Sequence, residues 1–356
     1  MKPRILSINP GSTSTKVALY EGGTLLGGRT LNHDIEEIRG KELTDQLPMR
    51  MRQINEFLSG VALLDAVVGR GGLLHPLPSG PYVVNKDMLS DLAACRYGVH
   101  ASNLGAPMAS LVSETYRTKI PAMVVDPVVV DEMDDVARLS GLPEIERRSV
   151  FHALNQKAVA RVISAESGIP YNEANLVVAH LGGGVTVGAH RRGRVVDVNN
   201  GLDGDGPMSP ERAGCLPAVQ LVHLCFAGGS TYEKMRRRIV GEGGFVAHLG
   251  TNDLRIVERQ AASDEKAALM LDAFAYQVAK EIGRAVAVLS GDVDAIIVTG
   301  GAAFCDRVYE EIYMRVHRYA KVYRRAGEDE MLALAEGALR VLEGKEHLRE
   351  YKRWDS

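Results

Sequence analysis

The sequence has few cysteines, and they are scattered. Cys95, Cys215, Cys225 and Cys305 include no C-x-x-C pair and no histidine and cysteine spacing of the kind that ligates zinc. A disulfide framework and a structural zinc site are therefore not expected. Because cysteine is used so sparingly, we expect a reduced, cytoplasmic protein.

Long apolar runs and a strong charge of either sign are also lacking. No window reaches the roughly 18 apolar residues that a membrane-spanning helix needs, and the apolar stretch in "MKPRILSINPG" is too short for a signal peptide. The formal net charge of −3 gives no broad basic field for nucleic acid or an anionic membrane. We therefore expect a small-molecule partner, with no nucleic acid and no membrane.

What the sequence does contain is an internal repeat. The stretch "ILSINPGSTSTKVALYEGG" lies over "LVVAHLGGGVTVGAHRRGR" so that Gly11 meets Gly182 and Gly22 meets Gly193. Each copy has the pattern of an apolar strand, a glycine-rich turn and a second, alternating strand. A chance overlay of two common hairpins is the alternative. With 356 residues available, the repeat predicts two domains that each open with a β-hairpin.

Strand-like and helix-like segments alternate along the rest of the chain. "LLDAVVGRGG" and "DAIIVTGGAAF" have the apolar runs of buried strands, whereas residues 264–290 carry apolar side chains at the three- and four-residue spacing of a helix. Asp264 and Glu265 lie at the start of that segment, where a helix dipole favours anions. This alternation predicts an α/β fold.

Three glycine turns follow predicted strands. The first, "NPGSTSTK", combines hydroxyl groups with Lys16, the second is "HLGGG" at residues 180–184, and the third is "TGG" at 299–301. Such turns offer backbone amides, hydroxyls and an ammonium group to an anion. The first turn has neither the Walker spacing nor G-x-G-x-x-G. Each could be a plain tight turn, but together they indicate a nucleotide polyphosphate held in a cleft between two duplicated domains.

Several longer stretches resemble one family. They include "ILSINPGSTSTKVALYE", "VVGRGGLLHPLPSGPYVVNKDML", "HLGGGVTVGAHRRGRVVDVNNGLDGDGPMSPERAG" and "VTGGAAF", and they extend from residue 4 to about residue 304. The chain resembles the acetokinase family, and within it the branch that acts on butyrate. That family is part of the acetate and sugar kinase, Hsp70 and actin superfamily.

The resemblance implies a fold of two duplicated actin-like, ribonuclease H-like ATPase domains with the nucleotide cleft between them. We expect an N-terminal domain at residues 1–150, completed by a C-terminal helix at about 340–356, and a nucleotide-binding domain at 151–339. Homo-oligomerisation is also expected from the resemblance.

The implied reaction is reversible transfer of the γ-phosphoryl group of ATP to a short-chain carboxylate, with Mg²⁺, to give an acyl phosphate and ADP. A carboxylate is already ionised at neutral pH and needs no general base. The difficulty lies in bringing two anions together and stabilising the charge that moves in the transition state. Positive and hydrogen-bonding groups should therefore dominate the site, and direct in-line transfer needs no covalent enzyme intermediate.

Five residues match catalytic or acyl-site positions of the family. Arg70 and Arg212 match its two arginines, one to orient the carboxylate and one to steady the phosphoryl group; a planar guanidinium suits both anions. Asp126 matches the aspartate that organises Mg²⁺ or holds an arginine. His152 matches a histidine that follows a phenylalanine, and His100 a histidine near the acyl site.

The nucleotide and metal residues follow from the same resemblance. Either Asp329 or Glu330 is the late acidic residue near the metal, and the sequence leaves that choice open. The expected phosphate and adenosine contacts are Asn9, Ser12, Ser14 and Lys16, then His180, Gly182, Gly183 and Gly184, and finally Gly300 and Gly301.

Two departures from the acetate kinase pattern favour an acid longer than acetate. Gly183 stands where that pattern has asparagine, and the chain is shorter than a typical acetate kinase. Propionate, butyrate, isobutyrate and branched acids remain open, as does acetate itself. A sugar kinase would need an aspartate base, for which Asp126 is the candidate. A non-enzymatic actin- or Hsp70-like ATPase would need an appendage or contact insertions, which the chain does not show.

Overall fold

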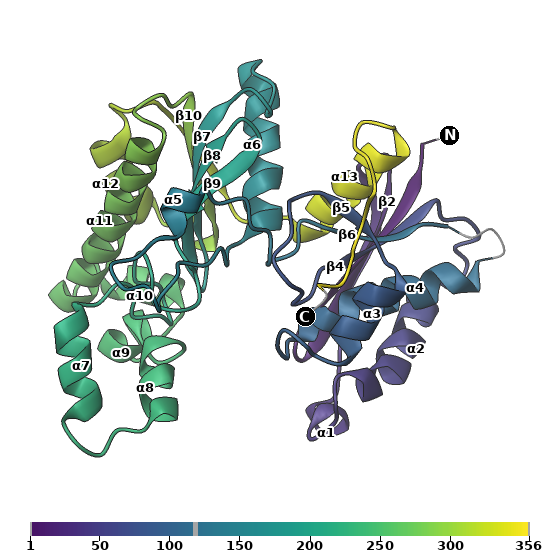
Figure 1. The fold of residues 1–356 in the computed structure, drawn as a ribbon, viewed down its shortest axis with the longest axis horizontal. Helices are drawn as coiled ribbons and strands as arrows, with labels where there is room; N and C mark the ends of the chain where they lie inside the picture. Colours follow the sequence, from purple (N-terminus) through teal and green to yellow (C-terminus); the bar gives the residue numbers. More distant parts are fainter. Residues whose placement is uncertain (1, 117–119, 355–356) are drawn as a thin grey trace. The chain divides into compact units, whose positions relative to one another are not determined.

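The structure, a computed structural model, describes residues 2–116 and 120–354. The chain divides into two compact units (Figure 1), the first comprising the described residues up to Val130 and from Asp329 onward, the second Asp131–Glu328. Each unit is built on its own mixed β-sheet. The predicted α/β class is confirmed.

The first unit has a seven-stranded sheet in the order β12-β5-β6-β4-β1-β2-β3. Leu6 and Ile8 pack with helices α2 and α4, whereas the Ser7 hydroxyl donates to the Met331 carbonyl at the start of α13. Helices therefore cover both faces, and the central strands β1, β4 and β6 are largely buried. The strands are β1 (Arg4–Pro10), β2 (Ser14–Glu21), β3 (Thr24–Asn32), β4 (Ala66–Arg70), β5 (Pro81–Val83), β6 (Ala122–Val125) and β12 (Arg349–Glu350); the covering helices are α2 (Leu47–Phe57), α4 (Gly105–Thr115) and α13 (Glu330–Leu342).

The second unit has a five-stranded sheet in the order β11-β10-β7-β8-β9. Val177 and Ala179 of β7 belong to the core formed with α11 and α12, and the alternate residues Leu176 and Val178 pack with α6 on the other face. These strands are β7 (Asn175–Leu181), β8 (Val185–Arg191), β9 (Arg194–Val198), β10 (Ala295–Gly300) and β11 (Lys321–Ala326); the covering helices are α6 (Ala153–Ser167), α11 (Glu265–Val288) and α12 (Asp306–Val316).

The two sheets share a common plan, so the repeat seen in the sequence is confirmed. In the first, β1 pairs antiparallel with β2, with Asn9 opposite Lys16, and parallel with β4. In the second, β7 pairs antiparallel with β8, with His180 opposite Thr186, and parallel with β10. Because strand ends collect at one edge of a sheet, each hairpin turn lies beside the end of a parallel neighbour.

The compact units differ from the expected domain limits at two segments. Residues 131–150 lie in the second unit, where the Asp134 amide donates to the Val196 carbonyl at 2.9 Å. Residues 329–339 lie in the first unit, on its sheet. The C-terminal helix expected at about 340–356 is wrong in its position: α13 ends at Leu342, Gly344 follows with a φ of 70°, and the chain then forms β12 beside β5.

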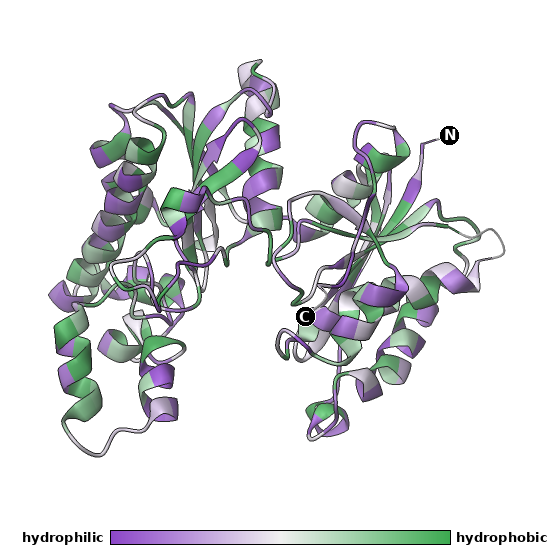
Figure 2. Cartoon of the chain, viewed as in Figure 1, coloured by the Kyte–Doolittle hydropathy of each residue, from purple (hydrophilic) through white to green (hydrophobic). Residues whose placement is uncertain are grey.

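One of the remaining helices has an unusual surface. Helix α7 is strongly apolar (Figure 2), yet none of its residues is buried, and Val219 and Phe226 are 66% and 85% exposed. No helix in residues 2–116 and 120–354 has the length and apolar content needed to cross a bilayer. The other helices are α1 (Ile35–Ile38), α3 (Lys86–Ala93), α5 (Asp135–Arg138), α7 (Ala218–Phe226), α8 (Tyr232–Ile239), α9 (Gly244–Leu249) and α10 (Leu254–Gln260), with 3₁₀ turns at Thr44–Gln46, Ala101–Leu104 and Gly301–Phe304.

Candidate active site

The first unit contains a pocket of about 290 Å³, here called the first-unit pocket. It lies where β1 and β4 end and the hairpin turn to β2 begins. Six of the residues singled out from the sequence line it, while Ser12 is exposed on the turn and is not part of the lining. The lining residues are Asn9, Pro10, Gly11, Ser14, Lys16, Arg70, His100, Ser102, Val128 and Glu330.

Glu330 joins two of the predicted residues in this pocket. Its carboxylate forms an ion pair with the Arg70 guanidinium and accepts a hydrogen bond from the Asn9 amide at 2.6 Å. Asp329 does something else: its Oδ1 accepts from the Leu332 amide at 2.9 Å and caps α13. Of the two acidic candidates, the structure therefore brings Glu330 to the pocket.

His100 faces the same pocket as a neutral ring. Its Nδ1 accepts from the Ser102 backbone amide at 3.2 Å and lies 2.8 Å from the Ser102 hydroxyl. Burial, together with the nearby charge of Arg70, lowers the pKa of His100. With Nδ1 accepting, the proton of the neutral ring is on Nε2, which makes that nitrogen a hydrogen-bond donor.

Asp126 is placed differently from the other predicted residues of this unit. It follows β6 with a φ of 40°, is 1% exposed, and its Oδ1 accepts from the Gly80 amide at 2.7 Å. Its own amide donates to the Gly80 carbonyl at 3.2 Å. It therefore ties the segment before β5 to the end of β6, and it is not among the described residues that line the pocket.

In the second unit, two histidines stack beside the glycine turn that links β7 to β8. The rings of His152 and His180 have centroids 4.1 Å apart and planes inclined by 23°. The His152 Nδ1 lies 2.9 Å from the Thr186 hydroxyl, and the His180 Nε2 lies 3.3 Å from a Glu328 carboxylate oxygen. His180 is only 1% exposed, so its ring is the buried member of the stacked pair.

Arg212 lies directly against the same turn. A Cβ on Gly184 would overlap the Arg212 guanidinium, which also donates to the Gly201 carbonyl. Ser209 donates to the Gly183 carbonyl at 2.7 Å and accepts from the Arg212 amide at 3.1 Å. Burial lowers the pKa of Arg212, although an arginine keeps its charge at neutral pH. The turn and the arginine thus form one packed unit, and a side chain at position 184 would displace the Arg212 guanidinium.

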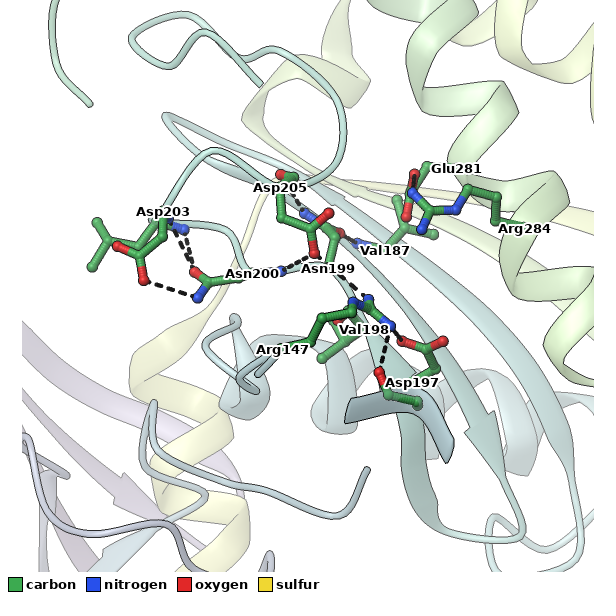
Figure 3. Close-up of polar contacts among 12 residues, drawn as sticks. Arg147, Val187, Asp197, Val198, Asn199, Asn200, Asp203, Asp205, Glu281 and Arg284 are labelled. Atoms are coloured by element: carbon green, nitrogen blue, oxygen red, sulfur yellow. Dashed lines mark hydrogen bonds and ion pairs between the residues drawn. The ribbon is translucent and has the colours of Figure 1, made fainter. Parts of the chain in front are cut away.

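A group of residues that sequence reasoning missed holds the loop that carries Gly201 (Figure 3). Arg147 donates to the Val198 carbonyl at 3.2 Å, pairs with Asp197 at 3.0 Å and reaches Asp205 at 3.5 Å. The Asn199 side chain accepts from the Val187 amide at 2.7 Å. The loop after β9 is therefore fixed at both ends. In the sequence, only the stretch "DVNNGLDGDG", rich in the turn-forming residues Asn, Asp and Gly, indicates such a loop.

The third glycine turn lies at the end of β10. Gly300 has a φ of 89°, and a Cβ there would come within 2.5 Å of the Leu181 carbonyl, so only glycine fits. Nothing lies within 4 Å of the corresponding position on Gly301. The turn therefore brings the end of β10 against the end of β7, next to the Gly182–Gly184 turn.

No group of three or more histidine, cysteine, aspartate or glutamate side chains in the described chain is arranged to hold a metal ion by itself. Asn9 and Glu330 nevertheless place an amide and a carboxylate together on the first-unit pocket. A magnesium ion often has only one or two protein carboxylates and completes its shell with phosphate oxygens and water.

Comparison with known proteins gives a consistent result. The sequence profile of the acetokinase family matches residues 124–316. Butyrate kinase 1 of Clostridium acetobutylicum is 50% identical over 355 residues, which cover 98% of this chain and 99% of that protein. A probable butyrate kinase of Coprothermobacter proteolyticus is equally similar over the same shares. Among solved structures, acetate kinase of Porphyromonas gingivalis superposes with a TM-score of 0.76 at 19% identity, over 96% of this chain and all of that one.

Proposed function

The chain belongs to the acetokinase family, and on that premise we propose that it is a butyrate kinase, which transfers the γ-phosphoryl group of ATP reversibly to butyrate or a branched short-chain acid. The observation that carries this proposal is the 50% identity to curated butyrate kinases over almost the whole of both chains. The donor set of each unit suits the reaction, because it is rich in cations and amides.

In the first unit, we assign the carboxylate and the phosphoryl group that it receives to the first-unit pocket. Arg70 presents a planar set of N–H donors whose orientation is fixed by Glu330. His100 donates from Nε2, and Lys16 adds a positive charge on β2. Together these groups offset the repulsion between the carboxylate and the phosphate and stabilise the charge of the transition state.

In the second unit, we assign the nucleotide phosphates to the Gly182–Gly184 turn, with Arg212 and His152 beside it. Backbone amides of a glycine turn approach an anion closely, and the Arg212 guanidinium supplies charge to the phosphoryl group in transfer. Gly300 and Gly301 are assigned to the adenosine. His180 acts through its stacking contact with His152.

The Glu330 carboxylate fits a bound Mg²⁺, because carboxylate oxygens are among the hard ligands that this ion prefers, and the Asn9 amide nitrogen, which donates to that carboxylate, would help to hold it in place. When bound, the ion would neutralise charge on the phosphate oxygens. Asp126, whose Oδ1 accepts from the Gly80 amide, is assigned to organise the metal or to hold an arginine.

We further propose that the protein is a homo-oligomer whose contact includes α7. The support is the set of exposed apolar side chains on and beside this helix, since apolar patches of this kind mark interaction sites. Light scattering of the wild type and of Val219→Glu, which leaves the proposed site untouched, tests this: the wild type should be larger than one chain and the variant smaller. The exposed apolar residues are Leu216, Val219, Val222, Leu224 and Phe226.

The test of the proposed activity is an acceptor panel. ADP formation is measured with ATP, Mg²⁺ and either acetate, propionate, butyrate, isobutyrate or glucose, with hydroxylamine to trap the acyl phosphate as hydroxamate. We expect the highest kcat/KM with butyrate or isobutyrate, together with hydroxamate. A response to glucose alone, or ATP turnover that needs no acceptor, would overturn the proposal.

A further inference from the structure

The hairpin turn of the first-unit pocket rests on a fully buried arginine that no sequence motif indicated. Arg50 of α2 is 0% exposed. Its Nη1 donates to the carbonyls of Gly11 at 3.0 Å and Ser14 at 3.2 Å and to the Thr15 hydroxyl at 2.9 Å. Its Nη2 donates to the Ser12 carbonyl at 3.2 Å. One guanidinium therefore binds three carbonyl groups of a four-residue turn.

This contact fixes which way the peptide groups of the turn face. In a planar trans peptide the C=O and the following N–H point in opposite directions. Because the carbonyls of Gly11 and Ser12 turn toward Arg50, the amides of Ser12 and Thr13 turn away from it. Both of these residues are exposed. Two successive backbone amides that face the same way in a turn can both donate to one anion.

Arg50 also carries a positive charge that nothing in contact with it neutralises. Its remaining partner is the Gln46 side-chain oxygen at 2.9 Å, so all the acceptors it contacts in the described chain are uncharged. Burial lowers the pKa of Arg50 to about 10, which leaves it charged at neutral pH. Burial, and then the charge of Arg50, lower the pKa of His33 to about 4, so His33 is neutral there. A buried cation without a counter-ion is costly.

We propose that Arg50 is a positioning residue for phosphate: it holds the Gly11–Thr15 turn with its amides outward and supplies positive charge behind them, so that the bound phosphate is its counter-ion. Arg50 does not touch the phosphate itself. This inference rests on the proposed function, because the bound phosphate group would belong to ATP or to the acyl phosphate.

Substitution by lysine or by methionine separates the two roles of Arg50, which are to hold the turn by hydrogen bonds and to supply positive charge. Lysine keeps the charge but has three donors on a single atom, so it cannot span the carbonyls of Gly11, Ser12 and Ser14. Methionine removes both the charge and the hydrogen bonds. Ile54→Ala is the matched control: Ile54 is 0% exposed, lies one turn along the same helix, and packs in the apolar core.

The full chain is titrated with inorganic phosphate, and binding is measured by calorimetry or ³¹P NMR. Circular dichroism confirms that each variant folds. We expect phosphate affinity to fall about tenfold in Arg50→Lys and more in Arg50→Met, because each lost charge-assisted bond is costly. Ile54→Ala should lower the melting temperature and leave phosphate affinity unchanged. In assays with butyrate, the arginine variants should raise the KM for ATP and change the KM for butyrate less than about twofold.

Phosphate affinities in Arg50→Lys and Arg50→Met equal to that of Ile54→Ala would overturn the inference, as would a wild type that does not bind phosphate. If Arg50→Met does not fold, the phosphate affinity of Arg50→Lys alone decides the test. Gln46→Ala is a milder variant, which should lower phosphate affinity severalfold. A wild type that binds phosphate in an Arg50-dependent way but phosphorylates no carboxylate would overturn the proposed function alone.

Discussion

At the scale of single residues, the neighbours Asp329 and Glu330 have separate roles. Glu330 pairs with Arg70 and Asn9 on the first-unit pocket, whereas Asp329 caps α13. We predict that Glu330→Gln lowers kcat about 100-fold and raises the Mg²⁺ concentration needed for half-maximal rate, because it removes the charge that orients Arg70 and suits the metal. Initial rates across a Mg²⁺ series measure both effects.

Asp329→Ala is the control for that experiment. Loss of the cap should reduce the free energy of unfolding by about 1 kcal/mol in urea denaturation, with kcat and the Mg²⁺ response unchanged. The reverse pattern, with the rate lost in Asp329→Ala and kept in Glu330→Gln, would show that the two roles have been assigned the wrong way round.

Arg212 gives a second prediction at this scale. In Arg212→Lys the charge remains, but a single ammonium group cannot reach both the Gly201 carbonyl and a phosphoryl oxygen as a planar guanidinium does. We expect kcat for hydroxamate formation to fall by about 10²- to 10³-fold, with a melting temperature close to that of the wild type. If the variant were as fast as the wild type, Arg212 would not contribute to stabilising the transition state.

At the scale of elements, the turn between β7 and β8 depends on glycine at one position. Gly184→Ala places a methyl group where the Arg212 guanidinium lies, so Arg212 must move and kcat should fall at least tenfold. Gly283→Ala, in the last third of α11 with open space around the added Cβ, is the matched control. It should keep full activity and raise the free energy of unfolding by about 0.5–1 kcal/mol. Equal kcat values for both variants would contradict this packing.

The elements that the sequence predicted well are those with a local signal. The two hairpins were visible as matching glycine turns, and α11 as a periodic segment capped by Asp264, whose side chain accepts from the Lys266 amide. The end of α13 was missed because helical spacing continues past Leu342, while pairing of β12 with β5 depends on contacts far apart in the sequence.

The residues that line the first-unit pocket were largely predictable from the sequence, and the residues that support its turn were much less so. Asn9, Lys16, Arg70 and His100 were found through motifs, and the structure brings them to one pocket. Arg50 and Arg147 were missed for a common reason: each acts on backbone carbonyls of a distant loop. An arginine within "LPMRMRQINEF" has no feature in the sequence that separates it from a solvated helix residue.

At the scale of the whole molecule, buried neutral histidines predict how stability depends on pH. In the folded chain the pKa of His33 is about 4 and burial holds that of His190 well below 6.5, whereas both titrate near 6.5 when unfolded. As the pH falls from about 7 to 5, the unfolded state takes up protons that the folded state does not. The free energy of unfolding should therefore decrease, with a slope of up to two protons from this pair.

Urea denaturation between pH 5 and 7.5 measures that slope for the wild type and for His33→Gln. The variant should be less stable at neutral pH, because the contact of His33 with the Thr15 hydroxyl is lost. Its free energy of unfolding should also depend less steeply on pH, by the equivalent of up to about one proton. An unchanged slope would mean that His33 titrates alike in both states.

The central claim is that a carboxylate oxygen of the acceptor attacks the γ-phosphorus of ATP, and oxygen transfer tests it most directly. The protein is incubated with ATP, Mg²⁺ and butyrate labelled with ¹⁸O in both carboxylate oxygens, and the acyl phosphate is cleaved by hydroxylamine. Hydroxylamine attacks the carbonyl carbon and expels phosphate with the former bridging oxygen. We predict one ¹⁸O in each phosphate released, read by mass spectrometry; unlabelled phosphate would show that water or another acceptor receives the phosphoryl group, and would contradict the account.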